Sequence, residues 1–202
     1  MKHDWKKNDK ALYGTKEAPL LLSVPPMVYF SVSGQGDPNA DAFSKVLEAL
    51  YTASYVLKML PKKESAPLGY IEYSVFPLEA VWTVPDEASI LDKSQYCYEA
   101  QIRQPAFCTT ELAARILQIA AKKKPHLPWQ AMQFVSHEEG RCVQALHIGS
   151  YDDETRTFAS MDAFCKGQGL TRRTQSHREI YLNDPRKTAP EKLKTLLRYQ
   201  IV

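Results

Sequence analysis

The sequence predicts an α+β fold in which duplicated strand-helix-strand-strand modules form one curved antiparallel sheet, with helices packed on one face. Two observations lead to this prediction. The same order of apolar patterns occurs twice, at about residues 27–105 and 141–202. In both places the first strand ends at a glycine, Gly34 or Gly149, shortly before an acidic helix start.

In the first module, β-branched and aromatic residues over 27–33 predict a strand between prolines and glycines. Apolar residues spaced three and four apart from Ala42 predict a helix that ends near Pro61. Two strand-like runs follow, at 70–84 and 95–104. The order is therefore strand, helix, strand, strand.

A middle helix is expected over 109–124, because a threonine cap signal opens it and three lysines precede the proline that follows. Residues 129–137 are expected to form a connecting strand. The second module then repeats the first, with expected elements at 141–149 (strand), 152–167 (helix), 176–183 (strand) and 194–201 (strand). We divide the chain into an N-terminal extension, 1–23, and one domain, 24–202.

The composition is typical of a soluble globular protein, and the cytoplasm is the expected location because no signal or anchor is readable. The 202 residues are 44% hydrophobic and 24% charged, and no apolar run approaches the roughly 20 residues that a membrane span needs. No secretory signal is readable at the N-terminus. A net charge of +3 is too small to argue for nucleic acid, and the segment before Val24 is too short for a helix-turn-helix module. The four cysteines lack zinc-ligand spacing, so we expect reduced thiols and no metal site.

Strand alternation gives a register for the two modules. Counting back from the two glycines places Tyr29 and Gln144 at equivalent positions, while Phe30 and His147 fall on the side expected to face the helices. The face away from the helices would then curve around a ligand. The module boundary is the expected groove.

Several segments resemble the GyrI-like small-molecule-binding proteins, in particular their stand-alone subclass. GYIEYSVFPLEAVW at 69–82 is similar to the PLEGLW-type strand of that subclass, with Ala80 in place of the usual glycine. LLLSVPPMVYFSVSGQGDPNADAF resembles its first strand and helix, and CVQALHIGSYDDE and HREIYLNDPRKTAPEKLKTLLR resemble its C-terminal half. The resemblance spans nearly the whole chain.

The resemblance implies a duplicated fold that binds amphipathic small molecules, often aromatic or cationic, in a central pocket with a buried glutamate. Some stand-alone members are cyclopropanoid hydrolases, which open the cyclopropane ring of DNA-alkylating natural products. Others are fused to DNA-binding domains and sense drugs. The expected partner is therefore an amphipathic aromatic or cationic small molecule, without direct nucleic-acid or membrane contact, and a homodimer is left open.

Glu179 is the candidate catalytic base. Alternation on its strand places Ile180 and Leu182 on one face and Glu179 with Tyr181 on the other. If the apolar pair packs on the helices, Glu179 points into the groove, where burial among aromatic rings would make it a better base. The alternative is a Glu179 that forms a salt bridge with Arg178 or Arg198 at the sheet rim.

Tyr73 is the candidate hydrogen-bond donor to the departing oxygen, because it is expected to occupy in the first module the place of Glu179 in the second. Trp82, Tyr29 and Tyr181 are candidate stacking partners for a flat ligand. For Tyr29 and Trp82 the alternative is core packing. Glu79 is a weaker site candidate that is more simply paired with a strand neighbour.

Gln144 is expected either to orient water or a ligand carbonyl, or to satisfy backbone groups. For His147, a hydrogen-bonded core histidine is favoured over catalysis. The sequence shows no serine-hydrolase elbow, phosphate loop or dinucleotide fingerprint, so no cofactor is expected. Two functions are compatible with these residues: detoxification by a cofactor-independent cyclopropanoid hydrolase, and non-catalytic binding, sensing or sequestration of drugs.

Overall fold

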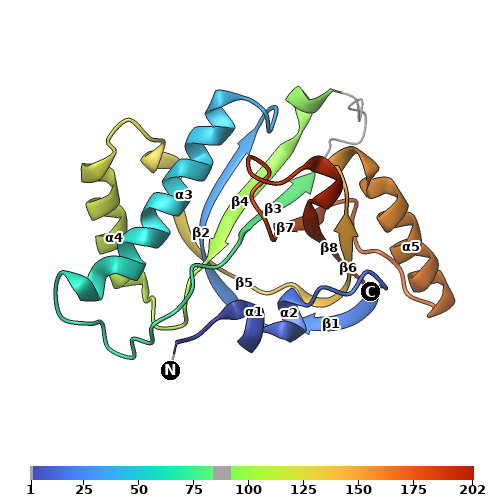
Figure 1. Ribbon diagram of the computed structural model, residues 1–202, viewed down its shortest axis with the longest axis horizontal. Coiled ribbons are helices and arrows are strands. Elements are labelled where there is room, and N and C mark those ends of the chain that lie inside the picture. Colours follow the sequence, from blue (N-terminus) through green and yellow to red (C-terminus); the bar gives the residue numbers. More distant parts are fainter. Residues whose placement is uncertain (1, 84–91) are drawn as a thin grey trace.

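The computed structural model describes residues 2–83 and 92–202, and it confirms the predicted α+β architecture (Figure 1). Eight strands form one antiparallel sheet in the order β1-β6-β8-β7-β3-β4-β2-β5. The strands are β1 (Leu20–Val24), β2 (Met27–Gln35), β3 (Leu78–Thr83), β4 (Cys97–Arg103), β5 (Gln133–His137), β6 (Gly140–Ile148), β7 (His177–Tyr181) and β8 (Lys194–Gln200). The α-helices are α1 (Trp5–Asn8), α2 (Lys10–Tyr13), α3 (Asp41–Met59), α4 (Thr110–Lys123) and α5 (Glu154–Gly167).

The helices form where the apolar spacing and the end signals agree. In α3 the buried positions recur every three or four residues, so one face of the helix packs on β2 and β4. Thr109 caps α4 as expected, since its side chain accepts a hydrogen bond from the amide of Leu112. Helix α5 packs on β6 through Met161 and Cys165.

The pairing of β3 with β7 joins the two predicted modules at the centre of the sheet. Leu78 faces Tyr181 and Ala80 faces Glu179 in this antiparallel ladder. The helices α3 and α5 lie on either side of this junction, as Figure 1 shows. Both of these helices pack on the same face of the sheet, because Phe30 and Ala145 contact them from that face. We call it the helix-bearing face.

The N-terminal segment packs against the opposite face of the sheet. Tyr13 of α2 donates a hydrogen bond to Glu79, and the carbonyl of Leu12 accepts one from Arg198. Strand β1 pairs with β6, so residues before Met27 belong to the folded body. The few apolar residues of the two short helices form no periodic pattern, and neither these helices nor β1 was predicted.

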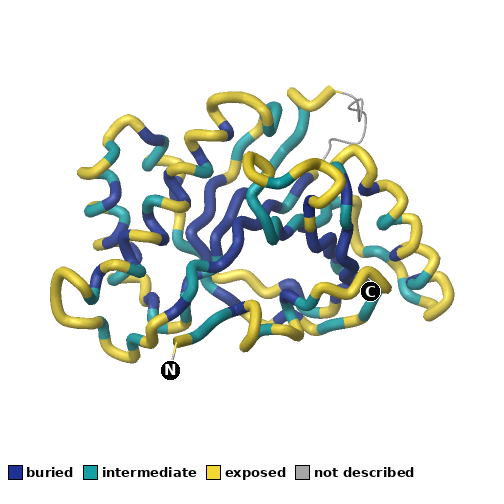
Figure 2. The backbone as a smooth tube through the Cα atoms, in the orientation of Figure 1, coloured by how far each residue is buried: buried dark blue, intermediate teal, exposed yellow. Residues whose placement is uncertain are grey.

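A network of buried ions fills the opposite face beneath this segment. Arg178 donates to Glu79 and to Glu139, in each case over 2.9 Å. Arg198 donates to Glu139 over 2.7 Å and to the amide oxygen of Gln144. Both arginines are 1% exposed and Glu79 is 0% exposed. Figure 2 shows that the backbone in the middle of the sheet is mostly buried. Burial disfavours the charge of Glu139, but the two guanidiniums outweigh this effect and lower its pKa.

Breaking this network should destabilise the fold strongly. Glu139→Ala leaves two buried guanidiniums without their shared carboxylate, which we expect to cost about 3–5 kcal/mol of unfolding free energy. Urea denaturation followed by circular dichroism measures this. Glu48→Ala, which removes an exposed partner of Lys124, is the matched control and should leave the midpoint unchanged. Equal midpoints for the two variants would contradict the assignment of the network as a stability determinant.

Candidate functional site

A wide groove of about 1480 Å³ lies on the helix-bearing face between α3 and α5. Its floor comes from the junction of β3 and β7, and its walls carry many aromatic rings. These rings include Phe43, Tyr55, Trp82, Tyr151, Phe158 and Tyr181. The groove is thus at the predicted module boundary, and its lining suits a flat apolar ligand.

Glu179 lies in this groove at the centre of a chain of hydrogen bonds. The hydroxyl of Tyr181 donates to Oε2 of Glu179 over 2.8 Å, and Nε1 of Trp82 donates to that hydroxyl over 2.9 Å. Nε2 of His177 lies 3.1 Å from Oε1 of Glu179. Because both carboxylate oxygens have a partner, the orientation of the Glu179 side chain is fixed.

Tyr181 is held as a hydrogen-bond donor in this chain. Burial raises its pKa well above the ordinary value, and the negative charge of Glu179 raises it further. The Tyr181 hydroxyl therefore keeps its proton at neutral pH. The ring of Tyr151 packs edge-on against Tyr181, with centroids 5.9 Å apart.

A second carboxylate, Glu154, points towards Glu179 from the first residue of α5. Glu154 is 7% exposed, and its Oε1 has no hydrogen-bond partner among the described residues. Ligand atoms of Glu154, His177 and Glu179 all lie within 4.8 Å of one another. Burial raises the pKa of Glu154 to about 10, and the charges of Glu179 and Asp152 act in the same direction.

The turn before α5 places Glu154 over the sheet. Gly149 has a φ of 141°, a backbone conformation that glycine adopts readily and other residues rarely do. The chain therefore leaves β6 and reverses sharply into α5. The sequence analysis treated Glu154 only as part of an acidic helix start and did not predict that it lines the groove. His177 was missed too, although its two-residue spacing from Glu179 places both side chains on one face.

Three of the predicted site residues, Glu179, Tyr181 and Trp82, meet in the groove. The structure does not bring Tyr73 to them. Its ring is 2% exposed, stacks on Phe76 behind the groove wall, and its hydroxyl is buried without a partner among the described residues. Burial also raises the pKa of Tyr73 far above the ordinary range.

The other predicted site residues lie on the opposite face of the sheet. Tyr29 is 0% exposed and packs under the guanidinium of Arg178, Gln144 is bonded to Arg198, and Glu79 is paired with Arg178. Core packing of Tyr29 and a strand-neighbour partner for Glu79 are thus confirmed. These residues cannot reach a ligand in the groove.

The expectation that the ligand groove lies on the face away from the helices was wrong. This explains why Tyr29, Gln144 and Glu79 do not line the groove. Ile180 lies on the opposite face beside Leu196, whereas Glu179 and Tyr181 share the face of the helices. The groove is therefore a gap between α3 and α5 and is not the far side of the sheet. The salt bridge expected as an alternative for Glu179 is also absent, because Arg178 and Arg198 point to the opposite face.

His147 is the core histidine that the alternation favoured. It is 1% exposed, and its ring nitrogens lie 2.9 Å from the hydroxyl of Thr157 and 2.9 Å from the carbonyl of Ser150. The side chain links β6 to α5 and to the turn between them. Its role is to hold α5 in place on the sheet.

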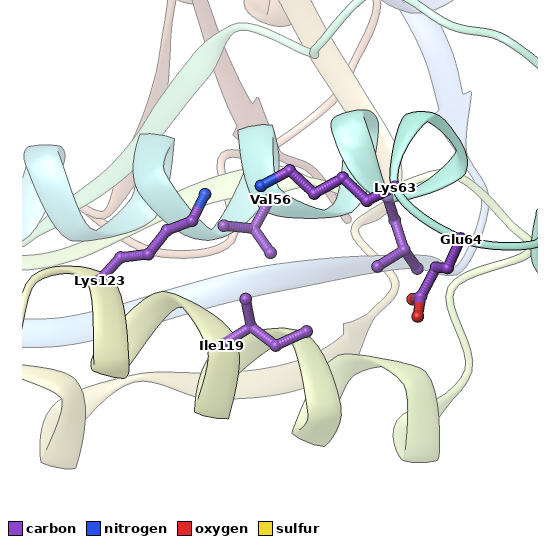
Figure 3. Close-up of a pocket in the computed structure, with 6 residues that line it drawn as sticks. Val56, Lys63, Glu64, Ile119 and Lys123 are labelled. Carbon is purple, nitrogen blue, oxygen red and sulfur yellow. The ribbon is translucent and has the colours of Figure 1, made fainter.

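A smaller hollow of about 110 Å³ lies between α3 and α4 (Figure 3). It is lined by the aliphatic side chains of Val56 and Ile119, with Lys63, Glu64 and Lys123 around them. Its volume is less than a tenth of that of the groove. It is too small for the polycyclic ligands considered above.

Comparisons with known proteins agree with the fold. A model of the GyrI-like small molecule binding domain matches residues 19–201. The crystal structure of an uncharacterized conserved protein from Listeria innocua is 36% identical, covers 99% of this chain and 100% of its own, and has a TM-score of 0.93. The structure of a hydrolase from the same organism is 35% identical over 99% of this chain and 100% of its own, with a TM-score of 0.91.

More distant similarity extends to the C-terminal domain of EcmrR, at 12% identity over 91% of this chain and 96% of that one, with a TM-score of 0.52. At that identity only the fold is shared. No curated protein matches the chain at a significant level. None of the described helices is long and apolar enough to cross a membrane.

Removing the buried charge of Glu154 should stabilise the protein in a pH-dependent way. An acid with a raised folded-state pKa costs no stability below its unfolded-state pKa of about 4.5, and the cost grows as the pH rises towards 10. We therefore expect Glu154→Gln to raise the unfolding free energy by about 1–3 kcal/mol at pH 7 and by little at pH 4. Urea denaturation at both pH values measures this difference.

The control for this experiment is Glu138→Gln, which removes an exposed carboxylate. It should change the midpoint equally little at both pH values. A Glu154→Gln variant with the same pH dependence as the wild type would show that Glu154 does not hold its proton in the folded state.

Proposed function

Because the chain belongs to the GyrI-like small-molecule-binding family, we propose that its groove binds amphipathic aromatic molecules and that the protein adds water to cyclopropanoid toxins. The domain would thus detoxify DNA-alkylating natural products. The observation that carries the proposal is the fixed carboxylate of Glu179 in an aromatic groove.

The arrangement has the parts that such a hydrolysis needs. A cyclopropane conjugated to a dienone is opened when the oxygen of water bonds to the ring methylene and the strained carbon–carbon bond breaks. The electron pair of that bond moves through the ring system to the carbonyl oxygen, which becomes a phenol oxygen. Glu179 takes one proton of the water, and the phenol oxygen gains a proton, so that the net change is addition of one water.

Tyr181 positions the base in this scheme. Its hydrogen bond to Oε2, supported by Trp82, holds the carboxylate so that one oxygen can face a water molecule. Tyr73, the expected hydrogen-bond donor to the substrate, does not line the groove, so the donor has to be a tyrosine that lies near Glu179. Tyr181 already donates its hydroxyl hydrogen to Glu179, so Tyr151 is the candidate donor to the carbonyl oxygen on which charge develops.

The similar hydrolase from Listeria innocua favours a catalytic function over binding alone. The second candidate, sequestration of amphipathic cations, is favoured by the absence of an arginine or lysine partner for Glu154 and Glu179 among the described ion pairs. A cationic ligand would then supply the missing positive charge. The two candidates differ in whether a product forms.

Glu179→Gln should abolish turnover and retain binding, because the amide keeps the shape of the side chain but cannot take a proton. The measurement is incubation with a cyclopropyl-dienone natural product, with mass spectrometry for the adduct heavier by one water. Binding is followed separately by quenching of tryptophan fluorescence. Turnover equal to that of the wild type would refute the assignment of Glu179 as base, and binding without product in the wild type would favour sequestration.

The two tyrosines give a matched comparison. Tyr181→Phe frees one oxygen of Glu179 from its hydrogen bond and should lower kcat by about 10–100-fold. Tyr73→Phe removes a buried hydroxyl that has no partner, so kcat should stay within about twofold of the wild type. Single-turnover rates of both variants, with circular dichroism as a check of folding, test this. The reverse order of effects would restore Tyr73 as the donor.

A further inference from the structure

Two carboxylates and an imidazole converge in the groove, with no arginine or lysine paired to them among the described residues. Glu154, His177 and Glu179 place one ligand atom each within 4.8 Å of the others, and Nε2 of His177 is 3.1 Å from Oε1 of Glu179. From these contacts we propose that Glu154, His177 and Glu179 form a binding site for a divalent first-row transition metal such as Zn²⁺. The inference does not depend on the proposed hydrolysis.

The first argument is the unsatisfied oxygen of Glu154. A buried carboxylate oxygen normally accepts a hydrogen bond, because leaving it without a partner costs free energy. Oε1 of Glu154 has no hydrogen-bond partner among the described residues, although only 7% of the residue is exposed. The side chain reaches towards His177 and Glu179, so an ion held by these three residues would satisfy it.

The second argument is the contrast between the two faces of the sheet. On the opposite face Glu79 and Glu139 are bonded to Arg178, and Glu139 also to Arg198. On the helix-bearing face, Glu154 and Glu179 have no guanidinium or ammonium within salt-bridge distance among the described residues. A divalent cation that displaces the proton of Glu154 would be balanced by the two carboxylates.

The third argument is geometric. Zinc bonds to carboxylate oxygen and imidazole nitrogen are about 2.0–2.2 Å long, so two ligands of one ion lie about 3–4 Å apart. The separation of 3.1 Å between His177 and Glu179 is already in this range. Glu154 needs only a side-chain adjustment, because its carboxylate is within 4.8 Å of both.

The scaffold around the three residues is rigid. His177 and Glu179 are two residues apart on β7, which is paired on both sides with β3 and β8. The ring of His177 packs edge-on against Phe158 of α5, with centroids 4.8 Å apart. Such support fixes the direction of the imidazole, as metal sites require.

The ligand types select the class of metal. Imidazole with carboxylates suits Zn²⁺ and its first-row neighbours, whereas Mg²⁺ and Ca²⁺ prefer oxygen ligands alone. Three protein ligands leave coordination positions that face the groove, where water or a ligand atom can bind. An ion there would use the lone pairs that Glu179 needs as a base, and bound metal would therefore inhibit the proposed hydrolysis.

Isothermal titration of chelator-treated, tag-free protein with ZnCl₂ tests the site. We expect one ion per chain with a dissociation constant of micromolar or tighter. Glu154→Gln and His177→Gln should each weaken binding at least tenfold. The matched controls are His137→Gln and Glu138→Gln, an exposed histidine and glutamate side by side on the surface, which should leave the affinity unchanged.

Titration with Co²⁺ gives a second measurement that reports ligation directly. Visible absorption bands of a low-symmetry Co²⁺ site should appear in the wild type and in both controls, and should be lost in Glu154→Gln, whose folding is checked by circular dichroism. No saturable binding, or binding that is equal in site and control variants, would overturn the proposal. Turnover measured in the presence of chelator separates this outcome from failure of the proposed hydrolysis.

Discussion

The antiparallel pairing of β3 with β7 is the constraint on which the rest of the structure depends. It joins the two modules into one sheet and fixes the direction of every side chain at their junction. Arg178 and Glu179 are consecutive on β7, so they must lie on opposite faces. The same strand therefore contributes to the buried ionic network on one side and to the groove on the other.

The buried carboxylates on the two faces of the sheet differ in their partners. Those on the opposite face are paired with arginines, whereas those in the groove have no such partner among the described residues. Glu139 is bonded to two arginines, and burial of such a group is tolerated because its charge is compensated. Glu154 is buried to a similar degree without a cation or a hydrogen-bond partner for Oε1 in the described chain. A protein that retains such an unfavourable group usually does so for binding or catalysis.

Much of the fold could be predicted from the sequence because its signals are local. Helix periodicity, caps and strand alternation place α3, α4 and α5 within a few residues and put Glu179 and Tyr181 on one face. Which face binds a ligand is a tertiary property. It depends on how residues before Met27 cover the sheet, and isolated apolar residues such as Trp5 and Tyr13 give no periodic pattern.

The duplicated fold carries an asymmetric site. Both modules contribute aromatic rings, such as Phe43 from the first and Phe158 from the second, but the helix start Asp41 of the first module is exposed and paired with Lys45. The second module contributes the acids, because the turn at Gly149 brings Glu154 over the sheet. The acidic groups of the groove therefore gather towards β7 and α5, which gives a bound small molecule a preferred orientation.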